Sequence, residues 1–400
     1  MRVLLSTIGS RGDVQPLLAL ALELRALGHE PRLCAPPDFR DLIDGYGLSF
    51  VPIGPEVRNT AKSPRPSPAP SPEALRQIAA ATVAGQFETV GAAAEDCDAI
   101  VGAGSLQIAT RSIAELRGIR YFFAAYCPIT LPSARHAPPH LSRLGETPAG
   151  ESADYGALWE QEARRWNDTF GAALNEQRTA AGLNPVADVQ SHIFTDHPLL
   201  AADATLGPWP TPADLEVLQT GAWILRDERP LPADLEAFLE ADKPPVYFGF
   251  GSMRATQETG RAMVEAAREL GFRAIVSKGW ADLAPVEEID CLPIAEVNQQ
   301  ALFPRVAAVV HHGGAGTTTA ATRAGVPQVV VPQLYDQHYW AQRIHDLGIG
   351  QAHPPVEPTA GSLVTALRHA LRPDVADRAR TVAGAIRSDG ATVAAQHLTA

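Results

Sequence analysis

The stretch His311-His312-Gly313-Gly314-Ala315-Gly316-Thr317-Thr318 decides the fold prediction for this sequence. It follows a valine-rich run, 306–310, that is typical of a buried strand, and it leads into a predicted helix, 317–324, that Gly325 ends. A strand, a glycine-rich turn and a helix present backbone N–H groups and a helix N-terminus to an anion. Glycines let the backbone approach a phosphate closely, and His312 and the threonine hydroxyls are further donors. The alternative is a tight turn whose histidines face the core.

The same order of strand, turn and helix opens the chain. Residues 3–8 are typical of a buried strand, and leucines then recur at helical spacing from Leu17 to Leu27. The next strand, 31–35, completes a β-α-β unit, which predicts a parallel, doubly wound sheet with ligands beyond the carboxyl ends of its strands. Because Asp13 follows the first strand, we place it on that functional edge.

The length of the chain, 400 residues, exceeds what one compact core organises, so two domains are expected. Strands and helices begin to alternate again after a stretch with three prolines near residue 210. We predict an α/β protein of two doubly wound, Rossmann-like domains that face each other across a cleft. The boundaries are an N-terminal acceptor domain, 1–205, a linker, 206–222, a C-terminal donor domain, 223–380, and a final helix, 381–400, for which the N-terminal domain is a candidate packing surface.

The composition of the chain limits the kinds of partner that it is expected to bind. Hydrophobic residues make up 46% and charged residues 20% of the chain, and the net charge of −12 argues against nucleic acid and anionic membrane surfaces. The cysteines Cys34, Cys97, Cys127 and Cys291 are widely spaced, which indicates free thiols in a reducing compartment. No signal peptide precedes the first strand, and no apolar run approaches the ~20 residues that span a bilayer. We therefore expect a cytoplasmic protein without stable membrane insertion.

Several motifs occur together in this sequence: Gly9-Ser10-Arg11-Gly12-Asp13, Gly249-Phe250-Gly251-Ser252, Ser277-Lys278-Gly279-Trp280, Glu296-Val297-Asn298, the histidine and glycine stretch quoted above, and Pro332-Gln333 with Asp336-Gln337. With these motifs the chain resembles a known family, the GT-B, family 1 glycosyltransferases of bacterial secondary metabolism. The most similar members are those that glycosylate glycopeptide aglycones of the vancomycin type. The resemblance covers nearly the whole chain, is strongest from about Gln219 onward, and weakens across 54–72 and 126–160.

The resemblance implies an inverting transferase whose C-terminal domain holds a nucleotide-diphosphate sugar. His312 would contact the diphosphate, and Val297 would meet the nucleobase through its backbone. Asp336 and Gln337 would bind the sugar hydroxyls, and Trp280 would lie near the base or in the core. The remaining donor residues would surround the phosphates; they are Ser252, Gly314, Gly316, Thr317 and Thr318.

On the acceptor side the resemblance implies that Asp13 is the general base, with Ser10, Arg11 and Gly12 beside it. The histidine and acid pair of plant relatives has no counterpart in this loop, so the carboxylate takes that place. An acidic side chain beside Arg11 at a helix N-terminus is the structural alternative. Asp336 is the rival base.

The function expected from the resemblance is transfer of a sugar from a dTDP- or UDP-sugar to a hydroxyl of a hydrophobic or peptidic aglycone. We expect no cofactor, no essential metal, and a monomer or weak dimer. Sterol or lipid glucosylation is the nearest alternative. From other classes, a nucleotide-sugar 2-epimerase and a non-catalytic sugar-nucleotide binder remain open.

Overall fold

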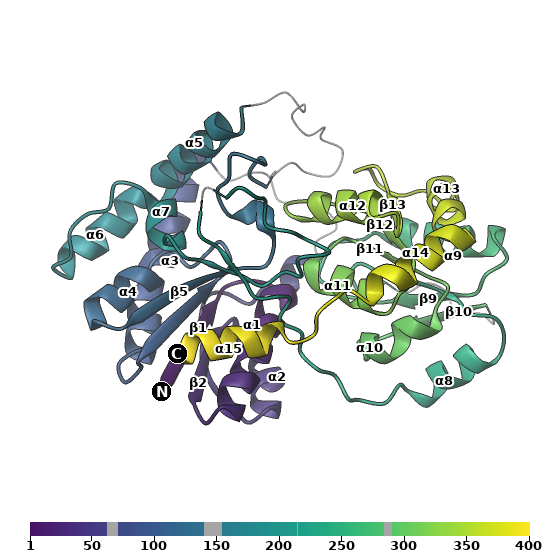
Figure 1. Cartoon of the computed structure of the whole chain (residues 1–400), viewed down its shortest axis with the longest axis horizontal. Coiled ribbons are helices and arrows are strands. Elements are labelled where there is room, and N and C mark those ends of the chain that lie inside the picture. Colours follow the sequence, from purple (N-terminus) through teal and green to yellow (C-terminus); the bar gives the residue numbers. More distant parts are fainter. Residues whose placement is uncertain (62–70, 140–153, 214, 284–289) are drawn as a thin grey trace.

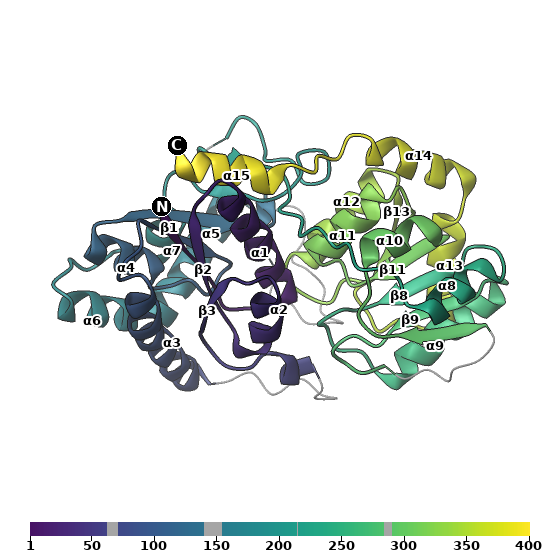
Figure 2. The ribbon, with the colours of Figure 1, turned by 90° about the horizontal axis from the view of Figure 1, so that it is seen from below.

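A computed structural model describes residues 1–61, 71–139, 154–213, 215–283 and 290–400. Within this part of the chain, two parallel sheets form two units that lie side by side (Figures 1 and 2). Residues 62–70 and 140–153, which belong to the segments 54–72 and 126–160 where the resemblance weakens, fall outside the described residues.

The first unit is built on a seven-stranded sheet with the order β3-β2-β1-β4-β5-β6-β7, and all its pairings are parallel. In β1, Leu4 faces one apolar layer while Val3 and Leu5 face the other, because successive side chains of a strand point to opposite sides. A sheet that is covered on both faces explains why its strands are almost uninterruptedly apolar. The strands are β1 (Arg2–Thr7), β2 (Glu30–Ala35), β3 (Ser49–Pro52), β4 (Ala99–Ala103), β5 (Arg120–Ala125), β6 (Leu199–Leu200) and β7 (Leu218–Gln219).

The second unit has a six-stranded parallel sheet with the order β10-β9-β8-β11-β12-β13. Strand β11, which leads into the glycine turn, lies in the middle, between β8 and β12. The strands are β8 (Val246–Gly249), β9 (Ala274–Ser277), β10 (Cys291–Ile294), β11 (Ala308–His311), β12 (Gln328–Val330) and β13 (Gly350–Ala352).

Helices cover both faces of both sheets (Figure 1). Those of the first unit are α1 (Arg11–Ala26), α2 (Arg40–Gly45), α3 (Pro72–Ala93), α4 (Thr110–Arg117), α5 (Tyr155–Trp166), α6 (Ala172–Ala180) and α7 (Val189–Phe194). Those of the second unit are α8 (Ala233–Glu240), α9 (Gln257–Glu269), α10 (Gln299–Leu302), α11 (Ala315–Arg323), α12 (Gln337–Asp346), α13 (Ala360–Ala370) and α14 (Pro373–Ala383). None of the helices described is long and apolar enough to cross a membrane.

The passage between the two units lies later than the predicted linker, 206–222. That segment contributes β7 to the first sheet, and Trp223 is still buried in the first unit. The Trp223 indole packs edge-on against Tyr126, and its N–H donates to the Thr220 hydroxyl over 2.9 Å. The prolines of this region mark irregular backbone. Irregular backbone also occurs inside a domain, so the prolines did not locate the linker.

The C-terminal segment forms two helices where the sequence suggested one. Helix α14 packs on α11 of the second unit, and the chain then crosses to α15 (Gly390–Thr399), which lies along α1 of the first unit (Figure 1). The Thr392 hydroxyl donates to a carboxylate oxygen of Glu23 over 2.9 Å. The backbone N–H of Arg387, within the crossing, donates to Asp203 over 2.9 Å.

Candidate active site

The glycine turn between β11 and α11 is tightly packed against the following strand and helix. Gly313 has a φ of +89°, a left-handed conformation that favours glycine, and a Cβ at this position would lie 2.7 Å from Val330 Cγ1. Gly314 is the N-cap residue of α11. The helix therefore begins two residues earlier than the sequence suggested and includes Gly316 in its first turn.

His311 has a structural role that the sequence could not separate from that of its neighbour. Its Nδ1 accepts the backbone N–H of Gly313 over 3.1 Å, which leaves the proton on Nε2 for Gln328 Oε1, 2.9 Å away. Gln328 in turn donates to the Thr322 hydroxyl over 2.9 Å. Burial lowers the pKa of His311 to about 3, so the ring is neutral near pH 7. Its two hydrogen bonds hold the turn in place.

His312 lies on the other side of the strand and faces two backbone turns. A Cβ on Gly314 would come within 2.5 Å of His312 Nε2, and one on Gly251 within 3.2 Å of Cε1. Burial lowers the pKa of His312 to about 4, so the ring is neutral near pH 7. A hydrogen bond with the Gly249 backbone opposes part of that fall in pKa. Its Nε2 is the ring atom that approaches the glycine turn.

The first turn of α11 offers backbone N–H groups without intrahelical acceptors. Gly316 is exposed, and nothing lies within 4 Å of the position that its Cβ would occupy. Thr317, half-buried, borders the same opening. Thr318 differs from the sequence expectation: it is fully buried, and its hydroxyl donates to the Gly314 carbonyl over 2.9 Å. Its hydroxyl is thus committed to the helix.

Asp13 occupies the third position of α1 and closes a capping box with Ser10. One carboxylate oxygen, Oδ2, accepts the Ser10 backbone N–H over 2.7 Å and the Ser10 hydroxyl over 3.3 Å. The other oxygen, Oδ1, points towards Gly104, where a Cβ would lie 3.4 Å away. Burial raises the pKa of Asp13 to about 6 despite these hydrogen bonds. The side chain is therefore both a helix cap and a carboxylate with one oxygen to spare.

Asp336 comes directly before α12 and beside the glycine turn, since a Cβ on Gly313 would meet the Gln337 carbonyl at 3.0 Å. Trp340 donates its indole N–H to Asp336 Oδ2 over 3.0 Å. Burial raises the pKa of Asp336 to about 6, and the negative charge of Asp13 adds to that rise. Two carboxylates with raised pKa values thus lie near each other, one from each unit.

Gln337 supports the loop before α12. Its amide oxygen accepts the backbone N–H groups of Gln333 and Leu334, over 2.8 and 3.3 Å. Its amide nitrogen contacts Met253 Sδ at 3.3 Å. The amide oxygen of this predicted sugar-binding residue thus accepts hydrogen bonds from the backbone.

Two polar contacts join the units across this region. Arg11 forms an ion pair with Glu296, which also lies 3.4 Å from Arg229. The Tyr335 hydroxyl lies 2.7 Å from that of Ser105, in the loop after β4. Arg11 therefore pairs with the other unit, while Asp13 has the position at the helix N-terminus that the structural alternative describes.

The remaining donor-side candidates lie on the carboxyl side of the second sheet. Ser252 follows β8, and Val297 lies between β10 and α10. The Trp280 ring contacts Phe39 of the first unit, with ring centroids 6.3 Å apart, and its backbone N–H donates to Gly251 over 2.8 Å. Gly12, at the start of α1, is exposed.

Asp96 and Asp98, which flank Cys97 directly before β4, lie at the opposite edge of the first sheet. Asp96 pairs with Arg2 at 3.1 Å and Arg32 at 2.9 Å, and Asp98 accepts the Arg2 backbone N–H over 2.7 Å. No group of three or more histidine, cysteine and acidic side chains in the described part of the chain could hold a metal ion.

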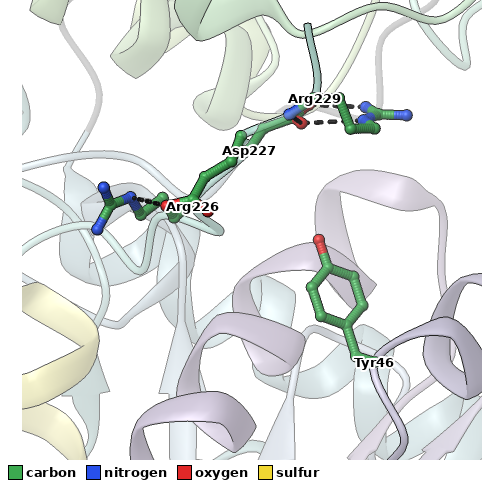
Figure 3. A pocket seen from close by; sticks show the side chains of 5 residues that line it. Tyr46, Arg226, Asp227 and Arg229 are labelled. Carbon is green, nitrogen blue, oxygen red and sulfur yellow. Dashed lines mark hydrogen bonds and ion pairs between the residues drawn. The ribbon is translucent and has the colours of Figure 1, made fainter.

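A separate pocket of about 360 Å³ lies beside the passage between the units (Figure 3). Its charged side chains pair with one another: Arg229 with Asp227 at 2.7 Å, and Arg226 with Glu228 at 2.9 Å. Tyr46 completes the lining. Because these charges compensate one another, the pocket lining offers no unpaired arginine to an anion.

Comparison with known families divides the chain in two. The N-terminal domain model of glycosyltransferase family 28 matches residues 3–134. The C-terminal domain model of the erythromycin biosynthesis protein CIII-like family matches residues 285–394.

Curated relatives match over the whole chain. Glycosyltransferase GtfE of Amycolatopsis orientalis is 52% identical over 100% of this chain and 97% of its own length. The vancomycin aglycone glucosyltransferase of the same organism is 48% identical, with the same coverage. Its dTDP-epi-vancosaminyltransferase is 44% identical over 96% of this chain and 93% of its own length.

Solved structures confirm the GT-B fold. The glycosyltransferase of kitacinnamycin has a TM-score of 0.73 at 20% identity and covers 100% of this chain and 98% of its own. Glycosyltransferase VinC in complex with dTDP has a TM-score of 0.68 at 20% identity, with the same coverage.

Proposed function

Because the chain belongs to the glycosyltransferase family that includes GtfE and the vancomycin aglycone glucosyltransferase of Amycolatopsis orientalis, we propose that it moves a sugar from a dTDP- or UDP-sugar to an aglycone hydroxyl. The acceptor class is a natural-product aglycone of the glycopeptide antibiotic type. The observation that carries this proposal is the proximity of three groups where the units meet: the glycine turn, Asp336 beside it, and Asp13 of the other unit.

The donor would lie with its diphosphate at the first turn of α11. Exposed Gly316 leaves room for a phosphate, the backbone N–H groups of that turn would donate to its oxygens, and His312 would add one more donor. Because His312 is neutral near pH 7, the partial positive charge of the helix N-terminus provides most of the compensation.

The reaction would be a single displacement at the anomeric carbon. The bond to the departing diphosphate breaks as the acceptor oxygen attacks from the opposite face, through a transition state with oxocarbenium character. Donors fixed at the helix N-terminus stabilise the charge that accumulates on the diphosphate. Asp13 would take the acceptor proton on its unused Oδ1, and a pKa near 6 makes it a stronger base than an ordinary aspartate. Asp336 would hold the sugar.

The direct test of substrate class is a panel of sugar nucleotides incubated with glycopeptide aglycones, sterols and no acceptor. Mass spectrometry should detect an aglycone heavier by one sugar residue, with dTDP or UDP released in equal amount. Conversion of the sugar nucleotide without an acceptor would favour an epimerase. Glycosylation of sterols alone would show that the acceptor is a sterol and not a glycopeptide aglycone.

We also propose that transfer does not depend on a metal ion. The described residues around the glycine turn offer a helix N-terminus and a neutral histidine for the diphosphate, without a cluster of carboxylates to hold a divalent cation. Full activity in the presence of EDTA is the expected result. Complete loss of activity on chelation, restored by magnesium or manganese, would contradict this mode of diphosphate binding.

The remaining expectations stand as proposals with the function. A cytoplasmic location suits an enzyme that uses sugar nucleotides, and the four described cysteines, all buried as free thiols, suit a reducing compartment. A monomer or weak dimer is the proposed state in solution.

A further inference from the structure

Helix α12 is docked on the first unit through the segment 205–207. Arg343 donates to the backbone carbonyls of Leu206 and Thr205, over 2.9 and 3.3 Å. Gly207 lies so close to the Trp340 ring that a Cβ on it would come within 2.8 Å of Cη2. The absence of a side chain at this position is what allows the indole to rest on the backbone of the first unit.

The same indole reaches the candidate sugar-binding carboxylate. Trp340 is 1% exposed, and it lies one helical turn after Asp336, so its N–H donates along the helix to Oδ2 over 3.0 Å. One side chain therefore contacts both the backbone of the first unit and a carboxylate of the second.

The residue on the other side of Asp336 also contacts the first unit. Tyr335 has a φ of +57°, which is unfavourable for a bulky side chain and persists where surrounding contacts enforce it. Its hydroxyl lies 2.7 Å from the Ser105 hydroxyl. The turn that carries Asp336 is thus held from both sides by the opposite unit.

We propose that Trp340 is a positioning residue for Asp336. Gly207 of the first unit packs against the Trp340 ring, so docking of the first unit fixes the orientation of the Asp336 carboxylate. This inference rests on the proposed function, since it explains how a donor-side carboxylate is aligned only when the acceptor-side unit is in place. Trp340 acts through Asp336 and does not itself touch the substrate.

The groups around Asp336 predict how the loss of Trp340 would change the pKa of this carboxyl group. The titratable groups that face it are Asp13 of α1, Cys127 after β5, and Tyr335 in its own turn. All of these are neutral or negative, while the Trp340 N–H favours the ionised carboxylate. Removing this donor should therefore raise the pKa of Asp336 above its present value of about 6.

The first test is the Trp340→Phe variant, which keeps an aromatic ring and removes the N–H. We expect the acid limb of the pH profile of kcat/KM for the sugar nucleotide to move upward by about 1 pH unit, with activity recovered at higher pH. Trp166→Phe is the matched control, because Trp166 donates to Glu162 over 2.9 Å with the same spacing in α5. A pH profile that is unchanged in Trp340→Phe, or displaced equally in Trp166→Phe, would overturn the proposal.

The second test needs no activity. The folded-state pKa of Asp336 is raised above that of the unfolded chain, so its protonation stabilises the fold, and this contribution is lost as the pH rises through about 6. In Trp340→Phe the thermal midpoint should continue to fall to a higher pH than in the wild type. This difference in the pH dependence of the thermal midpoint should vanish when both proteins also carry Asp336→Asn. If it persists in that background, the tryptophan stabilises the fold without acting on Asp336.

Gly207→Ala probes this contact with the Trp340 ring from the first unit. Its added Cβ would displace the indole from Asp336, so the pH profile should move in the same direction as in Trp340→Phe. An unchanged profile would overturn the role of Gly207. If the wild type transfers no sugar at all, the proposed function fails, while the unfolding series still decides the link between Trp340 and Asp336.

Discussion

Asp13→Asn is expected to lower the turnover number by roughly 10²-fold or more at saturating donor and acceptor, the scale of losing a positioned base. Asparagine retains an oxygen that can accept the Ser10 N–H, so the capping box and the fold should survive. What disappears is the basic Oδ1, which faces Gly104 and has no hydrogen-bond partner among the described residues. Donor affinity should change little.

The measurement is the transfer rate with both substrates saturating, together with the binding of dTDP or UDP by calorimetry. Asp188→Asn is the matched control, because Asp188 also caps a helix, α7, by accepting the Ser191 N–H over 2.7 Å. Asp336→Asn should mainly weaken use of the donor. Turnover close to that of the wild type for Asp13→Asn, beside a collapsed rate for Asp336→Asn, would assign the base to the second unit.

His312→Ala is expected to weaken the binding of dTDP or UDP by about 10- to 100-fold, the loss of one hydrogen bond to a charged group. The reason is the close approach of His312 Nε2 to Gly314, in the turn where the diphosphate would lie. Gly314→Ala should act in the same direction with the ring still present, because its Cβ would come within 2.5 Å of Nε2 and displace it.

Calorimetric titration of the full chain with each nucleotide measures this effect. His353→Ala is the control for general destabilisation: His353 is a buried histidine of the same unit whose Nε2 lies 2.8 Å from the Ser362 hydroxyl. It should lower stability and leave nucleotide affinity within a few-fold. Equal affinities for the wild type and His312→Ala would contradict the proposal that the diphosphate binds at the glycine turn.

The two histidines show where sequence reasoning works and where it ends. The apolar run, the glycines and the threonines predicted the strand, turn and helix of the second unit, and the structure confirms them with shifts of one or two residues. Which histidine supports the turn depends on strand β12, because Gln328 becomes a partner of His311 only when the two strands pair. Thr318 likewise depends on helix geometry, since its hydroxyl returns to the carbonyl one turn earlier.

Contacts between the units were beyond the sequence. The raised pKa of Asp13 comes from its burial, and the pairing of Tyr335 with Ser105 depends on how the two sheets are placed. A tryptophan one turn after Asp336 was the only local signal for the role of Trp340, and the pattern is visible in the sequence. The linker was placed too early because the prolines near residue 210 marked irregular backbone inside the first unit.

The central claim is a direct transfer of the sugar from a nucleotide to an aglycone hydroxyl through a single displacement. The anomeric configuration of the purified product, read from the coupling of its anomeric proton by NMR after reaction with an α-linked donor, tests this claim most directly. A single displacement gives a β-glycoside. An α-glycoside would require a second displacement, and the absence of any glycoside while the donor is consumed would contradict transfer itself.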